Sequence, residues 1–237
     1  MLFITPMSQT ISNRLRQTFA TMAGTVGMVV FLAWYFESIE SFPCEFSMLG
    51  VRGPSRFAFA IGLVLTAIQL MRLHTDLDSD NKYLFASLGI NLRFDIKVQH
   101  LAFVGATCMA LLGIFNSTTG WILAIHGASA LTCFLCYSVY IFVSPLPFFT
   151  RLLPLIVGVA RGLIGIPFKM YYAFAVFDRS SYININQLIR DIQLDKGFTN
   201  VVKWTSPLQW IHIILLMVCV YRHLVSRLYK IETHRFL

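Results

Sequence analysis

Between Val98 and Val143 the sequence reads VQHLAFVGATCMALLGIF, then NSTTG, then WILAIHGASALTCFLCYSVYIFV, so two apolar runs are joined by five small or polar residues. A helix needs about 20 mostly apolar residues to cross the roughly 30 Å hydrocarbon core of a bilayer. Each run is close to that length, and the NSTTG segment is long enough only for a tight turn. The stretch therefore predicts a transmembrane hairpin at 98–115 and 121–143, which the rest of the chain flanks.

The composition also indicates a membrane protein. The chain has 237 residues, of which 57% are hydrophobic and 13% are charged, whereas a soluble domain carries roughly 25% charged residues. A water-soluble fold has no means of burying so much apolar surface, so lipid must be the solvent for much of it. Because apolar runs take up most of the length, we predict a single membrane domain over residues 1–237.

Four further apolar runs, at 18–36, 57–73, 152–177 and 207–225, bring the number of predicted spans to six. The predicted fold class is therefore all-α, a polytopic integral membrane protein with six transmembrane helices. Between the last two spans, the apolar residues of 185–192 share one helical face, which predicts a short helix lying on the membrane surface.

Charge sets the expected orientation. Six spans place both termini on one side, and that side holds eleven of the 19 Lys and Arg residues, against six on the other. The positive-inside bias then makes both termini cytosolic. It also explains the net charge of +8, and no basic stripe interleaved with exposed aromatic residues points to nucleic acid. The eleven are Arg14, Arg16, Arg72, Lys82, Arg93, Lys97, Arg151, Arg222, Arg227, Lys230 and Arg235.

Small residues within the spans predict where helices approach one another, since lipid provides no hydrophobic drive between helices. Gly24 and Gly27 lie in the first span, and Gly62 lies four residues after Ala58 in the second. We also expect Gly127 and Gly162 to face neighbouring helices.

The sequence does not predict a metal, a cofactor or a catalytic centre. Cys133 and Cys136 lie one turn apart in a span, without the further ligands that zinc requires. Asp76, Asp78 and Asp80 alternate as in a calcium loop, but the glycine and the final glutamate of such a loop are missing. No Asp or Glu lies in the six spans, which disfavours hydrolysis and metal catalysis but leaves open a histidine acting alone.

Ionisable residues at membrane depth are candidate functional residues. His126 and His212 lie at similar predicted depths in spans four and six, and we expect them to face each other at a site for polar chemistry or lipid-head recognition. His126 has the alternative role of a hydrogen bond across the bundle. Arg161 is predicted to face the bundle interior or a hydrated cavity, whereas Lys169 is predicted to reach the luminal interface.

A second candidate site lies outside the membrane core. Four basic residues next to or after the last span are predicted to contact a cytosolic partner or anionic lipid heads, with orientation of the chain alone as the alternative. They are Arg222, Arg227, Lys230 and Arg235.

The layout from Arg14 to Arg227 resembles a known family. The motifs are PSRF at 54–57 at the mouth of span two, Ile-His at 125–126 early in span four, and Gln-Trp at 209–210 opening the last span. They resemble the six-span family of the damage-regulated autophagy modulators. That family also contains plasma-membrane relatives that help recruit a phosphatidylinositol kinase, and the Golgi factor for lipid remodelling of glycosylphosphatidylinositol anchors.

The resemblance implies a role in lipid handling and adds Gln209 to the candidate intramembrane site. Relatives often have Glu at the position of Gln209, and a YISD-type segment where this chain has CEFSMLGVRGPS. The shared acid chemistry and the first loop are therefore not carried over.

The function expected from these features is that of a non-catalytic membrane scaffold or regulator, which organises lipids or recruits lipid-handling or lipid-transport proteins. The expected partners are membrane lipids, above all anionic ones, and a larger protein. Two alternatives stay open: lipid remodelling of glycosylphosphatidylinositol-anchored proteins, as enzyme or obligate cofactor, and a small transporter or channel. The expected location is an endomembrane (endoplasmic reticulum, Golgi or lysosome) or the plasma membrane.

Overall fold

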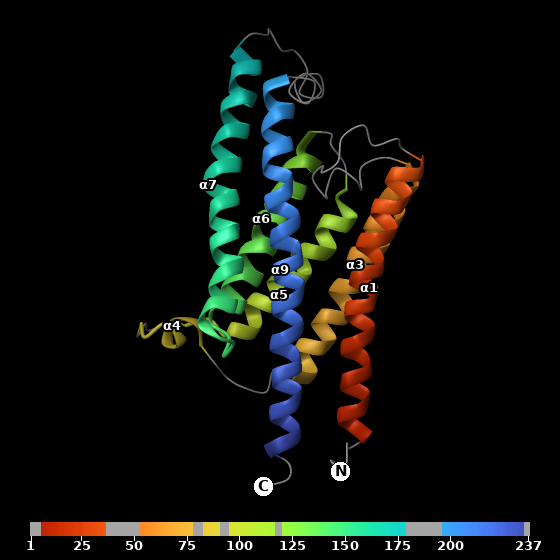
Figure 1. Ribbon diagram of the computed structural model, residues 1–237, viewed down its shortest axis with the longest axis vertical. Helices are drawn as coiled ribbons and strands as arrows, with labels where there is room; N and C mark the ends of the chain where they lie inside the picture. Colours follow the sequence, from red (N-terminus) through yellow and green to blue (C-terminus); the bar gives the residue numbers. More distant parts are fainter. Residues whose placement is uncertain are drawn as a thin grey trace.

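The computed structural model describes residues 6–36, 53–77, 83–90, 95–116, 120–178 and 196–234. Within these ranges the chain is helical, and pairing of extended backbone is limited to one bridge between Tyr83 and Lys97. Long helices run side by side along one axis, and the short helix α4 lies beside one end of the bundle (Figure 1). The helices are α1 (Pro6–Phe36), α3 (Gly53–Leu77), α4 (Leu84–Ser87), α5 (Val98–Ile114), α6 (Gly120–Phe142), α7 (Phe148–Asp178) and α9 (Lys196–His234).

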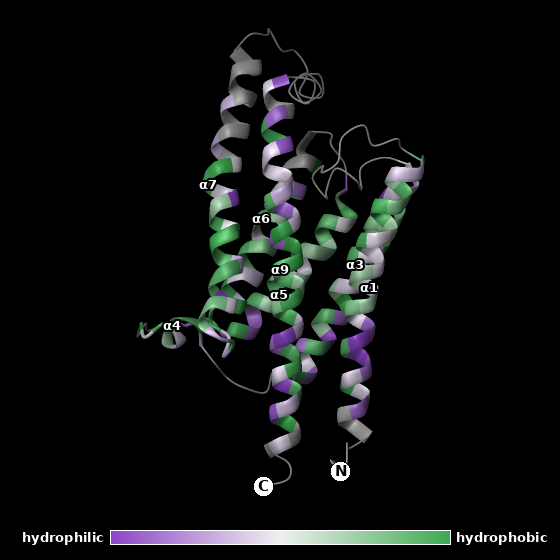
Figure 2. Ribbon diagram, viewed as in Figure 1, coloured by the Kyte–Doolittle hydropathy of each residue, from purple (hydrophilic) through white to green (hydrophobic). Residues whose placement is uncertain are grey.

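The bundle has the lengths and composition of a polytopic membrane protein. Five of the described helices, α1, α3, α6, α7 and α9, are long and apolar enough to cross a bilayer, and α5 is an apolar helix of 17 residues. That length is at the lower limit for a span. Figure 2 shows hydrophobic residues along the middle of the helices and hydrophilic residues gathered toward the ends of α1 and α9.

A helix covers each of the six predicted spans, but the helices at both ends of the chain are longer than predicted. The last one begins at Lys196 rather than at Pro207 and ends at His234. The predicted span at 207–225 began at Pro207. Instead, Thr205 and Ser206 donate their hydroxyls to the carbonyls of Val201 and Val202, and the helix continues through the proline. The surface helix predicted at 185–192 lies outside the described residues.

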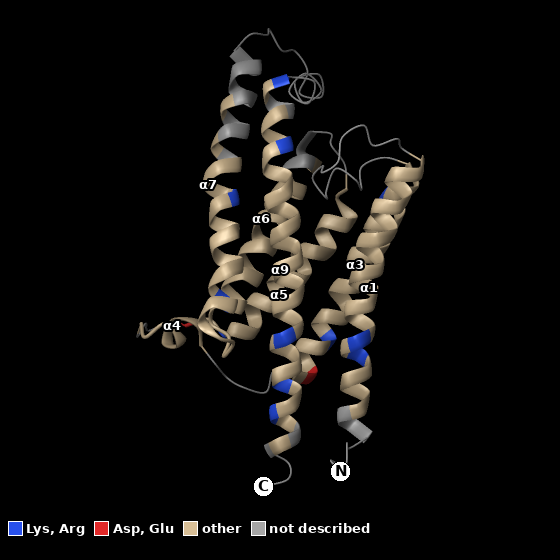
Figure 3. Ribbon diagram, viewed as in Figure 1, with Lys and Arg blue, Asp and Glu red and all other residues tan. Residues whose placement is uncertain are grey.

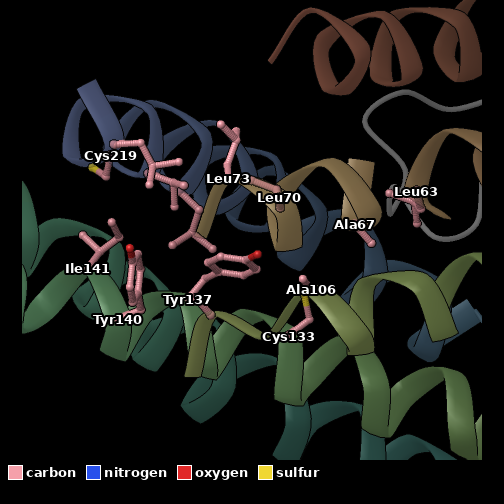
Figure 4. Close-up of a cluster of buried hydrophobic side chains, with 14 of the residues drawn as sticks. Leu63, Ala67, Leu70, Leu73, Ala106, Cys133, Tyr137, Tyr140, Ile141 and Cys219 are labelled. Atoms are coloured by element: carbon pink, nitrogen blue, oxygen red, sulfur yellow. The ribbon is translucent and has the colours of Figure 1, made fainter. Parts of the chain in front are cut away.

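Neighbouring helices pack in sequence order, α1 on α3, α3 on α5 and α5 on α6, while α7 packs on α9. The apolar core includes Leu70 and Leu73 from α3, which face Tyr137 and Tyr140 from α6 (Figure 4). α1 and α9 also touch, so the chain closes on itself and its last helix reaches the first.

Glycines mark the closest helix approaches, but only some of the predicted ones do so. A Cβ atom at Gly62 would collide with the Thr25 side chain of α1, as predicted for this position. By contrast, a Cβ at Gly24, Gly27, Gly127 or Gly162 would meet none of the described residues within 4 Å. The prediction for those four glycines was wrong because composition alone does not show which face of a helix meets a neighbour.

At Gly113, which the sequence did not single out, a Cβ would lie 2.8 Å from the carbonyl oxygen of Ala60, so α5 also approaches the α3 backbone closely. Close contacts of this kind let backbones pack without large side chains between them.

Candidate intramembrane site and basic end

A polar cluster lies where α6, α7 and α9 meet, and it contains two of the predicted site residues. The guanidinium carbon of Arg161 in α7 lies 4.5 Å from the ring centroid of Phe134 in α6. That ring stacks on the imidazole of His212 in α9, with centroids 5.1 Å apart and planes 26° apart. An arginine cation over an aromatic face is attracted by the ring quadrupole, and the attraction grows when water is excluded.

His212 is held in place on two further sides. Its Nε2 atom lies 3.0 Å from the hydroxyl of Ser138, within hydrogen-bond distance. On the α7 side, a Cβ atom at Gly158 would lie 2.8 Å from the Cε1 atom of the imidazole. Only glycine therefore leaves room for the ring at this crossing of α7 and α9. His212 is 2% exposed, and its Nδ1 atom has no hydrogen-bond partner among the described residues.

His126 lies elsewhere, so the expectation that the two histidines face each other was wrong. Its Nδ1 atom lies 3.2 Å from the carbonyl oxygen of Phe115, the residue that follows the end of α5. This contact ties the two helices of the 98–143 hairpin and satisfies a carbonyl that has no partner within its own helix. His212 instead contacts Ser138, which is twelve residues further along α6, or about 18 Å at 1.5 Å per residue.

The structure describes the side chain of Gln209 but not that of Lys169. Gln209 is buried, 4% exposed, one turn before His212 in α9, and it lines an apolar cavity between the helices. The backbone of Lys169 belongs to α7, but its side chain lies outside the described residues.

Basic residues gather at the end of the bundle where α1 begins and α9 ends (Figure 3). Exposed Arg16, Arg72, Arg222 and Lys230 belong to this end, which we call the basic end. Arg14, also there, forms an ion pair with Asp76 at 2.6 Å that joins α1 to α3.

Two of the four predicted contact residues do not belong to this exposed set. Arg227 is 8% exposed and faces the bundle rather than the surface, because it lies one turn from the buried His223 on the same side of α9. Arg235 lies outside the described residues. Arg222 and Lys230 are exposed as the prediction requires.

The sequence reasoning missed a buried polar cluster near the basic end. The hydroxyl of Tyr140 lies 3.3 Å from Nδ1 of His74, and its ring makes edge contacts at 5.2 Å with His74 and at 5.1 Å with His223. Gln99 donates its side-chain N–H to the carbonyl of His74 at 3.2 Å. The cluster thus joins α3, α5, α6 and α9. In the sequence, the signal for this cluster was a histidine near the end of each of two apolar runs, His74 and His223.

None of these residues forms a metal centre. Among the described residues no three His, Cys, Asp or Glu side chains lie close enough together to hold a metal ion. Comparisons with protein-family models, with curated proteins and with solved structures find no match to this chain.

Proposed function

We propose that the protein is a non-catalytic membrane scaffold whose basic end binds anionic lipid heads and recruits lipid-handling proteins from the cytosol. The observation that carries this proposal is the gathering of exposed Arg16, Arg72, Arg222 and Lys230 at one end of the bundle. Lys or Arg near an anionic membrane surface contributes about 1 kcal/mol each. In this proposal six spans cross the membrane and both termini are cytosolic, which agrees with the positive-inside bias.

The resemblance to the autophagy-modulator family supports the lipid-handling part of the proposal, since its plasma-membrane relatives help recruit a phosphatidylinositol kinase and its Golgi factor takes part in lipid remodelling of glycosylphosphatidylinositol anchors. The lipid bound at the basic end is then the signal that places this protein, and its partner, on a particular endomembrane or on the plasma membrane.

The test replaces Arg16, Arg72, Arg222 and Lys230 together by Gln. The matched control replaces Arg56, Lys196 and Lys203, which are exposed at the opposite ends of α3 and α9. Each protein is placed in phosphatidylcholine nanodiscs with a small fraction of fluorescent phosphatidylinositol phosphate, and energy transfer from a donor dye attached after Leu237 reports binding. Four charges with less than additive effects are worth about 2–3 kcal/mol, so we expect binding to weaken by about 30-fold or more.

The control variant is expected to bind as the wild type does, and binding to the wild type is expected to fall with added salt. Equal binding by the two variants would refute the assignment of lipid binding to the basic end.

A small transporter or channel is the second candidate, because the cationic Arg161 lies within the bundle, against Phe134 and next to His212. Intramembrane cations mark ion and substrate pathways in many membrane proteins. Flux of a small anion into proteoliposomes that is lost in Arg161→Gln would support this candidate over the scaffold.

A further inference from the structure

Residues 83–90 and 95–97, which include the short helix α4, form an exposed apolar segment beside the basic end of the bundle. We call them the α4 segment. Four of its large apolar side chains are 40–47% exposed, namely Tyr83, Leu88, Ile90 and Ile96. Only Asp95 and Lys97 in the segment carry a charge. Exposed apolar side chains gathered in one place mark a surface that meets lipid or another protein.

The chain itself fixes the height of the α4 segment relative to the bilayer. Lys97, its last residue, directly precedes Val98, where the apolar helix α5 begins. Tyr83 pairs with Lys97 through a backbone bridge, and the N–H of Leu84 donates to the carbonyl of Ile96 at 2.8 Å. Both ends of the segment are therefore held at the start of α5, where a span passes from the polar head-group region into the hydrocarbon core.

The α4 segment lies to the side of the bundle. In Figure 1, α4 lies outside the outline of the long helices. Figure 3 shows α4 at a height along the bundle that is close to that of the basic residues in α1 and α9. In a membrane, the space beside a helix bundle at the level of its charged ends is filled by lipid heads and the acyl chains next to them. Lipid is therefore the neighbour that the position of the segment supplies.

The backbone of the α4 segment suits a medium that contains little water. Each N–H group from Leu84 to Ile90 donates a hydrogen bond within the segment, either to a backbone carbonyl or to Asp95. Asp95 accepts two of these bonds, at 2.9 Å each, one on each carboxylate oxygen. Gly89, with a φ of 75°, turns the chain so that the N–H of Ile90 reaches the carbonyl of Phe85 at 2.8 Å. Because unpaired backbone groups are costly away from water, this internal pairing fits the segment for contact with lipid.

We propose that the α4 segment is an interfacial anchor, which inserts its exposed apolar side chains into the surface of the leaflet at the basic end. Anchors of this kind bind through buried apolar area and through attraction of basic residues to lipid phosphate. Tyr83 is of the residue type that favours the head-group level, and the ammonium group of Lys97 stays beside the phosphates. The anchor does not require a cytosolic partner, so it goes beyond the function proposed for the basic end.

The test measures which medium single side chains meet in the full-length protein, with one copy in each phosphatidylcholine nanodisc. A genetically encoded fluorescent amino acid replaces Leu88 or Ile96 in separate preparations. Quenching by lipids that carry a nitroxide just below the head group reports contact with lipid, and quenching by iodide reports contact with water. We expect strong quenching by the lipid and weak quenching by iodide at both positions. No anionic lipid is present, so the result is independent of anionic-lipid binding by the basic end.

Two reference positions calibrate the two quenchers. Leu131 is 55% exposed in the middle of α6, and a probe there is expected to respond to nitroxide lipid and not to iodide. Lys230 is exposed near the end of α9, and a probe there is expected to respond to iodide.

A double substitution tests whether apolar side chains hold the segment in lipid. Leu88→Asp with Ile90→Asp, in the protein with the probe at Ile96, should lower the ratio of lipid to iodide quenching by about tenfold or more, since two apolar groups are lost from the interface. Leu88→Gln with Ile90→Gln is a milder form. The matched control, Leu88→Ile with Ile90→Leu, keeps the apolar area and should leave the ratio unchanged.

Folding of each variant is checked by a single symmetric peak in size-exclusion chromatography. Iodide quenching at Leu88 and Ile96 as strong as at Lys230 would place the segment in water and overturn the anchor. Quenching by neither reagent would mean that protein covers the segment, which would also overturn it. If the lipid quenching at Ile96 is unchanged in both the Asp and the Gln variants, the apolar side chains do not hold the segment in the leaflet, and the proposal is wrong.

Discussion

Two glycines one turn apart in α7 provide a sharp test of how His212 is held. A Cβ atom at Gly158 would lie 2.8 Å from Cε1 and 3.1 Å from Nε2 of His212, whereas a Cβ at Gly162 would meet none of the described residues within 4 Å. We therefore expect Gly158→Ala and Gly162→Ala to change stability in opposite directions. The two substitutions are chemically identical and lie in the same helix, so their intrinsic helix propensities are matched.

The magnitude follows from the contacts. Alanine favours a helix over glycine by about 1 kcal/mol, and Gly162→Ala is expected to stabilise the protein by about that amount. At Gly158 the added methyl displaces the imidazole from the Ser138 hydroxyl and from the Phe134 ring. Overpacking costs about 1–3 kcal/mol, and an interhelical hydrogen bond in a membrane is worth about 0.6 kcal/mol. After subtraction of the propensity gain, we expect Gly158→Ala to destabilise by roughly 0.6–2.6 kcal/mol.

The assay is the unfolding of the purified protein in a mild detergent, followed by tryptophan fluorescence during a titration with a denaturing detergent. His212→Ala in each background completes the comparison, because removal of the ring should erase most of the difference between the two glycine variants. Equal effects of Gly158→Ala and Gly162→Ala would refute the close crossing of α7 and α9 at His212.

Three further predictions concern other contacts. Gly62→Leu should lower the yield of folded protein much more than Gly127→Leu, since a side chain at Gly62 would collide with Thr25, whereas a Cβ at Gly127 meets none of the described residues within 4 Å. Equal yields of the two variants on size-exclusion chromatography would mean that α1 and α3 do not approach each other closely at Gly62. Tyr140→Phe, which leaves His74 without its hydroxyl partner, should destabilise by about 1 kcal/mol in the same unfolding assay, whereas the exposed control Tyr229→Phe should have no effect. Desolvation raises the pKa of Asp95, but hydrogen bonds from the backbone N–H groups of Phe85, Ala86 and Ile96 together outweigh it and lower the pKa below its usual value. The order that this carboxylate gives to residues 83–90 and 95–97 should therefore be present at neutral pH and be lost as pH falls through the lowered pKa. A protection factor of the Ala86 amide against hydrogen exchange, corrected for the intrinsic pH dependence of exchange, that stays constant down to pH 2 would contradict this.

The sequence predicted the helices well because run length and hydropathy are local properties. Continuous apolar runs of about 20 residues, such as those at 57–73 and 121–143, have the length that a helix needs to cross lipid, and the structure has α3 and α6 there. Helix ends were harder. The predicted last span began at Pro207, whereas the hydroxyl bonds of Thr205 and Ser206 that accompany the continued helix are visible only in the structure.

The arrangement of the site was less predictable because it depends on which helices are neighbours and at what height. His126 and His212 have similar depths when each span is counted from its predicted start. The early start of α9 at Lys196 and its register against α6 instead place His212 beside Ser138. Likewise, Thr66 is an ordinary helical threonine in the sequence, and only the structure shows its hydroxyl at a cavity, without a hydrogen-bond partner among the described residues.

The side of the membrane on which the basic end lies tests the central claim most directly. α1 begins and α9 ends at the basic end (Figure 1), so an epitope tag after Leu237 reports its location. A second tag at residue 186, in the predicted loop between α7 and α9, reports the opposite end. In sealed microsomes we expect added protease to remove the tag after Leu237 and to spare the tag at residue 186 until detergent opens the vesicles. Protection of the tag after Leu237 would place the basic end in the lumen and would contradict a scaffold that meets cytosolic partners and anionic lipid heads there.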